Sequence, residues 1–202
     1  RKKQILIRFL RALASCFSKT GKEKNMFDGS FVAIVTPFKN GKVDYEGLKN
    51  LIEFQIQNGT NGIVPCGTTG ESATLSLEEH EEVIRFTIET VAKRVPVVAG
   101  SGSNSTADAL RLTKAAEKMG ADGALLISPY YNKPTQKGLY EHYRLISENV
   151  NIPMILYNVP GRTASNLSSA TTVALSRLKN IAGIKEASGN LVQISEIIRD
   201  AK

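Results

Sequence analysis

The sequence predicts an α/β fold in which β-strands and α-helices alternate around a parallel sheet. Short apolar runs recur about every 30 residues, which is the length of one βαβ unit. The runs are continuously apolar, a pattern typical of parallel strands that are buried on both faces. Helical patterns lie between them, and strict β-α alternation indicates a sheet that is covered by helices. The six predicted strands begin at Phe31, Gly62, Val95, Gly123, Ile152 and Ile181.

The first two helices are predicted from their capping residues. Asp44 is a suitable N-cap for a helix that ends near Gly59 and carries apolar residues on one face. Ser76 and Glu79 have the spacing of a capping box, in which each side chain accepts a hydrogen bond from the other residue's backbone N–H. We expect the helix that starts there to end at residues 91–96, where its apolar periodicity breaks.

The remaining helices are predicted from the same signals. A third helix is expected from Ser105 to Gly120, because glycine is typical of the position just after a helix. Further helices are expected after Thr135, Ser168 and Asn190. Together the strands and helices make six β-α units.

Polar clusters at the strand ends favour a (β/α)8 barrel over a doubly wound sheet. A dinucleotide-binding sheet needs a glycine-rich phosphate turn after its first strand, and residues 35–44 contain none. Polar clusters instead follow nearly every predicted strand, at the end where a barrel builds its active site. These clusters are GTTGE, GSGSNS, SPYYNKP, YNVPGRT and KEASG.

The net charge of +7 is confined to the first part of the chain. Residues 1–25 hold eight Lys or Arg and one Glu, whereas residues 26–202 hold 18 basic and 18 acidic side chains. A neutral body with no basic face argues against nucleic-acid binding. The apolar run in the basic segment is interrupted by Arg8 and Arg11 and is too short to cross a membrane. We therefore expect an N-terminal extension, 1–25, outside the fold and one barrel domain, 26–202.

The origin of the extension bears on localisation. Its composition is similar to that of a transit peptide, while Met26 resembles a natural start and favours upstream or vector-derived sequence. Cys16 and Cys66 provide neither a disulfide framework nor metal-ligand spacing, which favours a reducing compartment. We therefore expect a cytoplasmic protein, or a plastid protein if the extension is a transit peptide.

Lys185 is a candidate nucleophile because it lies at the end of an apolar strand, where a charged side chain is unusual. Partial burial disfavours the ammonium form, and the neutral amine can condense with a carbonyl group to form a Schiff base. The alternative is a lysine that extends to solvent at the strand end or pairs with Glu186. Spacing alone leaves both interpretations open.

Three tyrosines at neighbouring strand ends could transfer protons for such an amine. Tyr157 ends the preceding predicted strand, although a buried structural tyrosine is the alternative. Tyr130 and Tyr131 could either pack in the core or form a hydroxyl relay.

Candidate anion ligands follow two other strands. Thr68 and Thr69 lie between glycines that allow backbone N–H groups to approach an anion, although many tight turns have this composition. Arg162 is a candidate bidentate ligand for a carboxylate, and a surface loop arginine is the alternative.

Four segments together, GTTGES, PYYNKP, YNVPGRT and GIKEASG, resemble the dihydrodipicolinate synthase family of Schiff-base lyases in the pyruvate-aldolase superfamily. The similarity covers residues 26–202. It implies that Lys185 forms an imine with pyruvate. It also implies that Tyr157, Thr69 and Tyr131 form a proton relay, with Tyr131 reaching the site from a neighbouring subunit of a homotetramer.

The resemblance also implies the substrates. Thr68 and Thr69 would hold the pyruvate carboxylate, and Arg162 would bind the carboxylate of L-aspartate 4-semialdehyde. The product, 4-hydroxy-tetrahydrodipicolinate, would enter the diaminopimelate route to lysine, and no metal or organic cofactor is implied. Related aldolases such as N-acetylneuraminate lyase share the lysine and the tyrosine but lack the arginine, so Arg162 is the discriminating residue.

A lysine-regulatory site is a further implication of the resemblance. The matching positions are Ser72, Ala73, His80, Asn104 and Tyr130. Leu77 and Asp108 stand where sensitive family members often have histidine and glutamate, which leaves feedback inhibition open. From its spacing alone, His80 is expected on a helix surface.

Chain length supports a rival hypothesis. An eight-stranded barrel needs about 250 residues, and six units are predicted after the extension. We therefore expect a barrel that is truncated at its C-terminus to about six units. The rival hypothesis is that the chain is a non-catalytic fragment of a member of this family.

Overall fold

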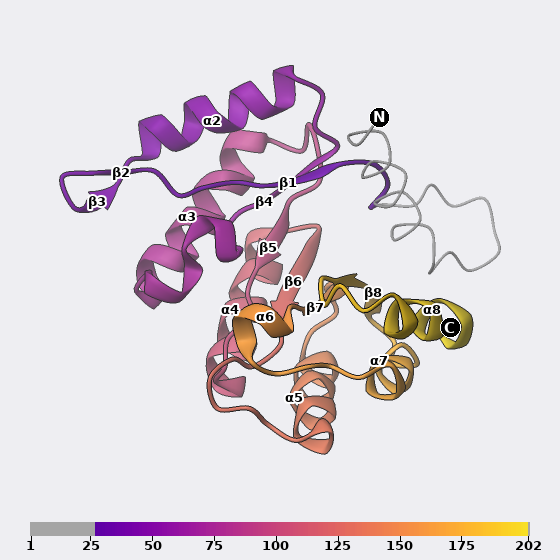
Figure 1. The fold of residues 1–202 in the computed structure, drawn as a ribbon. Helices are drawn as coiled ribbons and strands as arrows, with labels where there is room; N and C mark the ends of the chain where they lie inside the picture. Colours follow the sequence, from indigo (N-terminus) through magenta and orange to yellow (C-terminus); the bar gives the residue numbers. More distant parts are fainter. Residues whose placement is uncertain (1–26, 202) are drawn as a thin grey trace.

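The computed structural model describes residues 27–201, in which six parallel strands form an arc with helices around it (Figure 1). The strands are β1 (Phe31–Ala33), β4 (Gly62–Val64), β5 (Val98–Gly100), β6 (Gly123–Ile127), β7 (Met154–Asn158) and β8 (Ile181–Glu186). β1 pairs with β4, and β5 to β8 pair in succession. A single parallel bridge between Ile63 and Val97 joins β4 to β5. All six predicted strands are confirmed.

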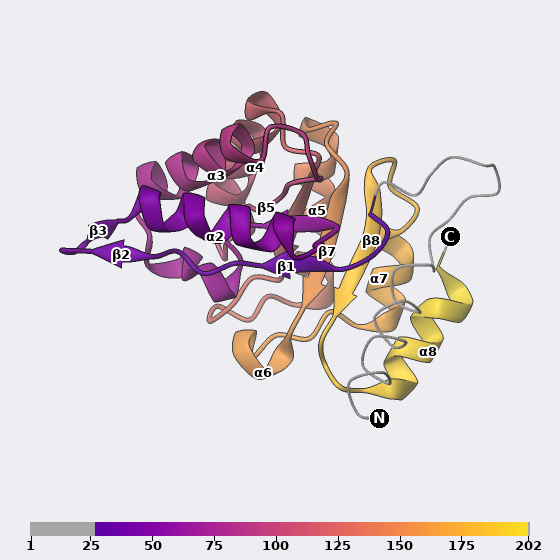
Figure 2. The same ribbon diagram turned by 90° about the horizontal axis from the view of Figure 1, so that it is seen from above.

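The helices follow one another around the outside of the strands (Figures 1 and 2). They are α2 (Tyr45–Gln57), α3 (Leu77–Val91), α4 (Thr106–Met119), α5 (Gln136–Asn149), α7 (Ser169–Leu175) and α8 (Leu191–Asp200). At each predicted N-cap the side chain accepts a hydrogen bond from a backbone N–H two or three residues on, and the capping box of Ser76 and Glu79 is present. Among residues 27–201, no helix is both long enough and apolar enough to cross a membrane.

A β-hairpin precedes α2 and was not predicted. Its strands, β2 (Phe38–Lys39) and β3 (Lys42–Val43), are antiparallel, and its turn is formed by Asn40 and Gly41 with φ angles of 54° and 74°. Positive φ at both central residues is the geometry for which an Asn-Gly pair is favoured. The pair is therefore the sequence signal that could have located this hairpin.

The core has two layers, one on each side of the strands. The outer layer lies between strands and helices and includes Leu126, Tyr143 and Leu156, all fully buried. The inner layer faces the interior of the arc and includes Val98 and Tyr157. β4 and β5 are buried throughout, but β1 and β8 are mostly half-buried. The prediction of strands buried on both faces is wrong for β1 and β8, since each pairs on one side only in the described chain.

Two phenylalanines pack against the inner layer of the core. The rings of Phe27 and Phe31 meet edge to face, with centroids 6.0 Å apart, and both pack against the inner layer. Gly62 makes room for Phe31, because a Cβ atom at Gly62 would lie 2.1 Å from the Phe31 ring. Phe27, from the segment before β1, and Phe31, at its start, therefore extend the inner layer of the core.

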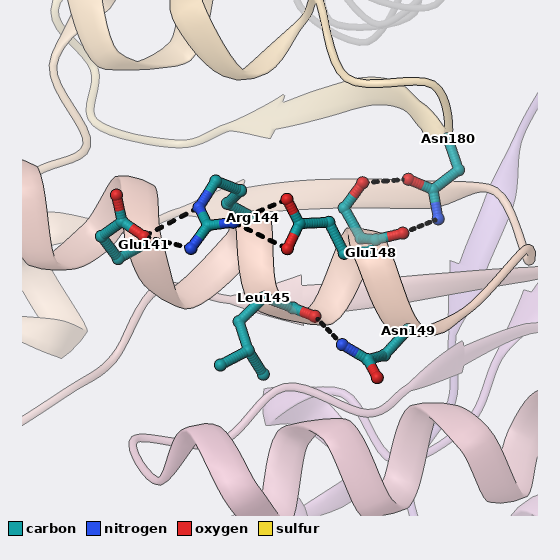
Figure 3. Close-up of polar contacts among 7 residues, drawn as sticks. Glu141, Arg144, Leu145, Glu148, Asn149 and Asn180 are labelled. Atoms are coloured by element: carbon teal, nitrogen blue, oxygen red, sulfur yellow. Dashed lines mark hydrogen bonds and ion pairs between the residues drawn. The ribbon is translucent and has the colours of Figure 1, made fainter.

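At the opposite end from the polar loops, Asn180 joins the entry of β8 to the end of α5 (Figure 3). Its Nδ2 donates to the backbone oxygens of Ser147 and Val150 at 3.4 and 3.0 Å, and its Oδ1 accepts from the Ser147 hydroxyl. On the same helix, Arg144 forms ion pairs with Glu141 and Glu148. Asn180 thus satisfies carbonyl groups that a helix C-terminus leaves without partners.

Candidate active site

Lys185 and Tyr157 lie side by side on adjacent strands. They are register partners across the β7–β8 pair, and Lys185 Nζ is 4.4 Å from the centroid of the Tyr157 ring. Tyr157 is buried in the inner layer, so both side chains face the interior of the arc. The sequence placed these two groups at neighbouring strand ends, and the structure brings them into contact.

Lys185 is exposed as a whole residue, as in the alternative of a lysine that extends to solvent at the strand end. The reason is its position on β8, which has no further strand beside it in the described chain. The strand and the Tyr157 ring still displace part of its hydration shell, and this desolvation lowers the pKa of the Lys185 amine below its ordinary value. The amine is therefore both accessible and easier to deprotonate than a free lysine.

Glu186 is not the ion-pair partner of Lys185. Successive residues of a strand point to opposite faces, so Glu186 points away from the interior and is buried on the helix side. Its carboxylate accepts hydrogen bonds from Asn158 and Gln193 there. Sequence reasoning missed this environment, although the alternation along the strand was available as a signal.

The loop after β4 presents two threonine hydroxyls. Thr68 and Thr69 begin a short 3-10 helix (Thr68–Gly70), and both are exposed. The loop begins at Cys66, whose φ of 53° is in the left-handed region. Gly100 permits this path, because a Cβ atom there would lie 2.2 Å from the Cys66 carbonyl oxygen. The hydroxyls are therefore held by a strained turn packed against β5.

Thr36 supports the same loop and was missed by the sequence analysis. Its side chain is buried, and its hydroxyl donates to the Gly70 carbonyl oxygen at 2.7 Å.

The site offers neither a reactive thiol nor a metal centre within the described residues. Burial raises the pKa of the Cys66 thiol, which disfavours the thiolate form. Among residues 27–201 there is no cluster of His, Cys, Asp or Glu that could hold a metal ion.

A cavity of about 280 Å³ lies among the polar loops. It brings together several predicted site residues: Thr68, Tyr130, Tyr157 and Arg162 all line it. Arg162 reaches it from α6 (Pro160–Thr163), a short helix directly after β7. Thr69, Tyr131 and Lys185 do not line it. Tyr157 therefore connects this cavity to the neighbouring amine.

Tyr131 lies outside the cavity. Its side chain is 89% exposed, and its φ of 70° is in the left-handed region. Its backbone N–H donates to the Thr163 carbonyl oxygen at 3.2 Å, which fixes the backbone while the ring faces solvent. Within one chain Tyr131 is thus available for contact with another molecule.

The five residues assigned to lysine regulation separate in the structure. Ser72, Ala73 and Tyr130 line the cavity, and Asn104 is half-buried. His80 is buried, and its Nε2 lies 2.6 Å from the Gly100 carbonyl oxygen, so the expectation of a surface histidine is wrong. α3 turns this residue toward the core, and burial lowers the pKa of its imidazole.

Comparison with known families agrees with these motifs. The model of the Dihydrodipicolinate synthetase family matches residues 26–202. The chain is 62% identical over 174 residues to a 4-hydroxy-tetrahydrodipicolinate synthase of Syntrophus aciditrophicus. The alignment covers 86% of this chain and 60% of that relative, so the chain spans about 60% of the length of the curated relatives it matches.

Solved structures give the same result for the fold. A dihydrodipicolinate synthase from Aquifex aeolicus superposes with a TM-score of 0.85 at 52% identity, over 87% of this chain and 60% of that structure. The chloride-inhibited enzyme from Acinetobacter baumannii, complexed with pyruvate, superposes with a TM-score of 0.82 at 55% identity, over 85% and 59%. This similarity confirms the predicted (β/α)8-barrel fold class, of which residues 27–201 form six β-α units.

Proposed function

Because this chain belongs to the dihydrodipicolinate synthetase family, we propose that it condenses pyruvate with L-aspartate 4-semialdehyde through a Schiff base on Lys185. The product would be 4-hydroxy-tetrahydrodipicolinate, the compound named in the curated relatives. The reaction would serve the diaminopimelate route of lysine biosynthesis. We place the protein in the cytoplasm, as a homotetramer.

The contact between Lys185 and Tyr157 carries this proposal. The neutral amine attacks the ketone carbon of pyruvate to form a carbinolamine, and uptake of one proton with loss of water leaves a protonated imine. The imine withdraws electrons from the adjacent methyl carbon, which loses a proton and attacks the aldehyde carbon of the second substrate. The lowered pKa of Lys185 supports the first step, since more of the amine is neutral at a given pH. The Tyr157 ring lies beside the amine, and its phenol would transfer protons during these steps.

The polar loops support binding of two carboxylates. Thr68 and Thr69 offer hydroxyl and backbone N–H groups for the pyruvate carboxylate at the start of a 3-10 helix. Arg162 lines the cavity beside Tyr157 and would bind the carboxylate of aspartate semialdehyde. That charge favours this aldehyde over the uncharged aldehydes that sugar-acid aldolases accept.

The exposed Tyr131 ring supports an oligomer in which it completes the proton relay of a neighbouring subunit. Ser72, Ala73 and Tyr130 lie at the cavity, where a bound lysine could act on the same loops. We include this regulatory role in the proposal for those three residues and for the half-buried Asn104, and leave out His80 because it is buried.

Borohydride reduction in the presence of pyruvate tests the proposal. The purified chain is incubated with pyruvate and sodium borohydride, and intact mass and peptide mapping locate the reduced adduct. We expect a pyruvyl adduct on Lys185, because the imine is trapped as a stable secondary amine. A folded chain that forms no adduct would overturn the proposal and favour the reading of a non-catalytic fragment.

A further inference from the structure

We propose that Asn158, Glu186 and Gln193 form a buried positioning network that holds Lys185 against Tyr157 and fixes the loop that carries Arg162. The catalytic part of this inference rests on the proposed function. The geometric part does not depend on it.

Glu186 is the centre of the network. It is 8% exposed, and its Oε2 accepts hydrogen bonds from Asn158 Nδ2 at 2.9 Å and Gln193 Nε2 at 3.0 Å. Its Oε1 accepts from the backbone N–H of Ser188 at 2.7 Å. No lysine or arginine among residues 27–201 forms an ion pair with this carboxylate. A buried carboxylate is costly unless its oxygens are satisfied, so its position depends on these three neutral donors.

The network sits one residue beyond the reactive pair. Asn158 and Glu186 are register partners immediately after Tyr157 and Lys185, and they point to the opposite face of the sheet. The backbone N–H of Ala187 donates to the Asn158 carbonyl oxygen at 2.8 Å, which continues the pairing past the strand end. Holding Asn158 against Glu186 on the helix side therefore holds Lys185 opposite Tyr157 on the interior side.

Register at this pair needs such a constraint. The β7–β8 ladder contains an irregularity near its start, where Met154 pairs with Ile181 but Ile155 pairs with Gly183. A shift of one residue moves every following side chain to the other face of a sheet. Four of the six β8 residues are half-buried or exposed, so packing alone specifies the register of this strand weakly. The hydrogen bonds of the network fix the register of β8 against β7 at the end of the strand.

The same side chains anchor the segment after β7. Asn158 Oδ1 accepts from the Leu167 backbone N–H at 2.9 Å, and Asn158 Nδ2 donates to Asn166 Oδ1 at 2.9 Å. Asn166 Nδ2 in turn donates to Gln193 Oε1 at 2.9 Å. Residues 159–168, which include Arg162, are thereby closed into a loop whose end is fixed to β7 and α8.

The test compares Glu186→Gln with Asn180→Ala. Gln has nearly the same shape as Glu but offers one acceptor oxygen, so its amide group must face one of the three donors. Asn180→Ala is the matched control, because it removes part-buried hydrogen bonds just before the other end of the same strand (Figure 3). Thermal unfolding of both variants measures their general loss of stability.

The first readout is the rate of borohydride-trapped adduct formation against pyruvate concentration. In Glu186→Gln we expect the maximal rate to fall about tenfold, since small misplacements of reacting groups are costly. The half-saturating pyruvate concentration and the fraction of chain finally trapped should not change. Asn180→Ala should keep a maximal rate within about twofold of the starting chain, because it leaves the reactive geometry intact. A loss of trappable fraction without a change of rate, or equal rate losses in both variants, would indicate a purely structural role and overturn the proposal.

The second readout needs no reaction. The Lys185 side chain lies over the Tyr157 ring, so its ε-methylene protons should show an upfield ring-current shift in the spectrum of lysine-labelled protein. Lys185→Arg assigns the resonance. The shift should persist in Asn180→Ala and disappear in Glu186→Gln, and its persistence in Glu186→Gln would contradict the network's role. If the starting chain traps no pyruvate while this pattern is observed, the proposed function fails and the positioning inference stands.

Discussion

Strands β7 and β8 are hydrogen-bonded partners, yet they are stabilised differently. β7 is buried almost throughout, with Met154, Leu156 and Tyr157 in packed layers on its two faces. In β8 only Ile181 and Glu186 are buried, three residues are half-buried and Lys185 is exposed. Packing therefore positions the tyrosine of the reactive pair, whereas hydrogen bonds around Glu186 position the lysine. The comparison teaches that the two halves of one site can depend on different forces.

The largest effect is expected from removal of the Lys185 amine on β8. Lys185→Ala should abolish the borohydride-trapped pyruvate adduct, because it removes the amine that lies against Tyr157. Lys179→Ala, an exposed lysine just before the same strand, is the control and should leave the adduct unchanged. Peptide mapping distinguishes the two, and an adduct that persists in Lys185→Ala at the same yield would sink the mechanism.

Truncation of two register partners measures the difference in packing directly. Leu156 and Ile184 face each other across β7 and β8 on the helix side, but only Leu156 is fully buried. Leu156→Ala should lower the free energy of unfolding by about 3 kcal/mol because it leaves a cavity. Ile184→Ala should lower it by about 1 kcal/mol. Urea unfolding monitored by circular dichroism gives both values, and equal losses would remove the distinction between the strands.

Substitution of Arg162 should distinguish binding of the aldehyde from formation of the imine with pyruvate. It follows β7, whereas the imine forms on β8, so Arg162→Ala should spare trapping of pyruvate. The rate of aspartate semialdehyde consumption should fall roughly 10- to 100-fold, because the variant loses a hydrogen bond to a charged carboxylate and the free energy of such a bond corresponds to a factor of this size. Arg177→Ala, an exposed arginine beyond α7, serves as control. Coupled assays with varied aldehyde concentration test this, and equal effects on both steps would argue against the division.

The smallest effect concerns pH and the helix behind β7. His142 on α5 is buried, its Nε2 has no hydrogen-bond partner in the described chain, and burial lowers its pKa to about 4. The folded protein therefore binds this proton less readily than the unfolded chain. The stability that follows is fully present above the unfolded pKa of about 6.5 and is lost as the pH falls toward 4.

Between pH 6.5 and 5.5 the free energy of unfolding should fall by about 1 kcal/mol because of His142. His80, whose pKa is also lowered, adds an effect of the same sign. His142→Phe should flatten the profile measured by urea unfolding at several pH values. A profile unchanged by that substitution would assign the pH dependence to other groups.

Local sequence signals predicted the elements well. The six strands and the caps from Asp44 to Asn190 depend on apolar runs and short polar side chains that act within a few residues. The hairpin at Asn40 and Gly41 was equally local and was overlooked. Such features could be predicted because their cause lies in neighbouring residues.

The environment of each site residue was harder to predict. Lys185 and Tyr157 were placed at adjacent strand ends, and their contact follows from parallel pairing. The exposure of Lys185 and the burial of His80 depend on which elements pack nearby, which no single segment encodes. The network of Glu186 joins residues from β7, β8 and α8, and only the folded chain brings them together.

The exposed ring of Tyr131 also provides an optical reporter. The sequence contains no tryptophan, so Tyr131→Trp would introduce the single indole fluorophore of the chain. With the native ring 89% exposed, emission from the isolated chain should be at long wavelength and readily quenched by iodide. A concentration-dependent blue shift would then follow subunit association in real time, without labels or any enzymatic assay.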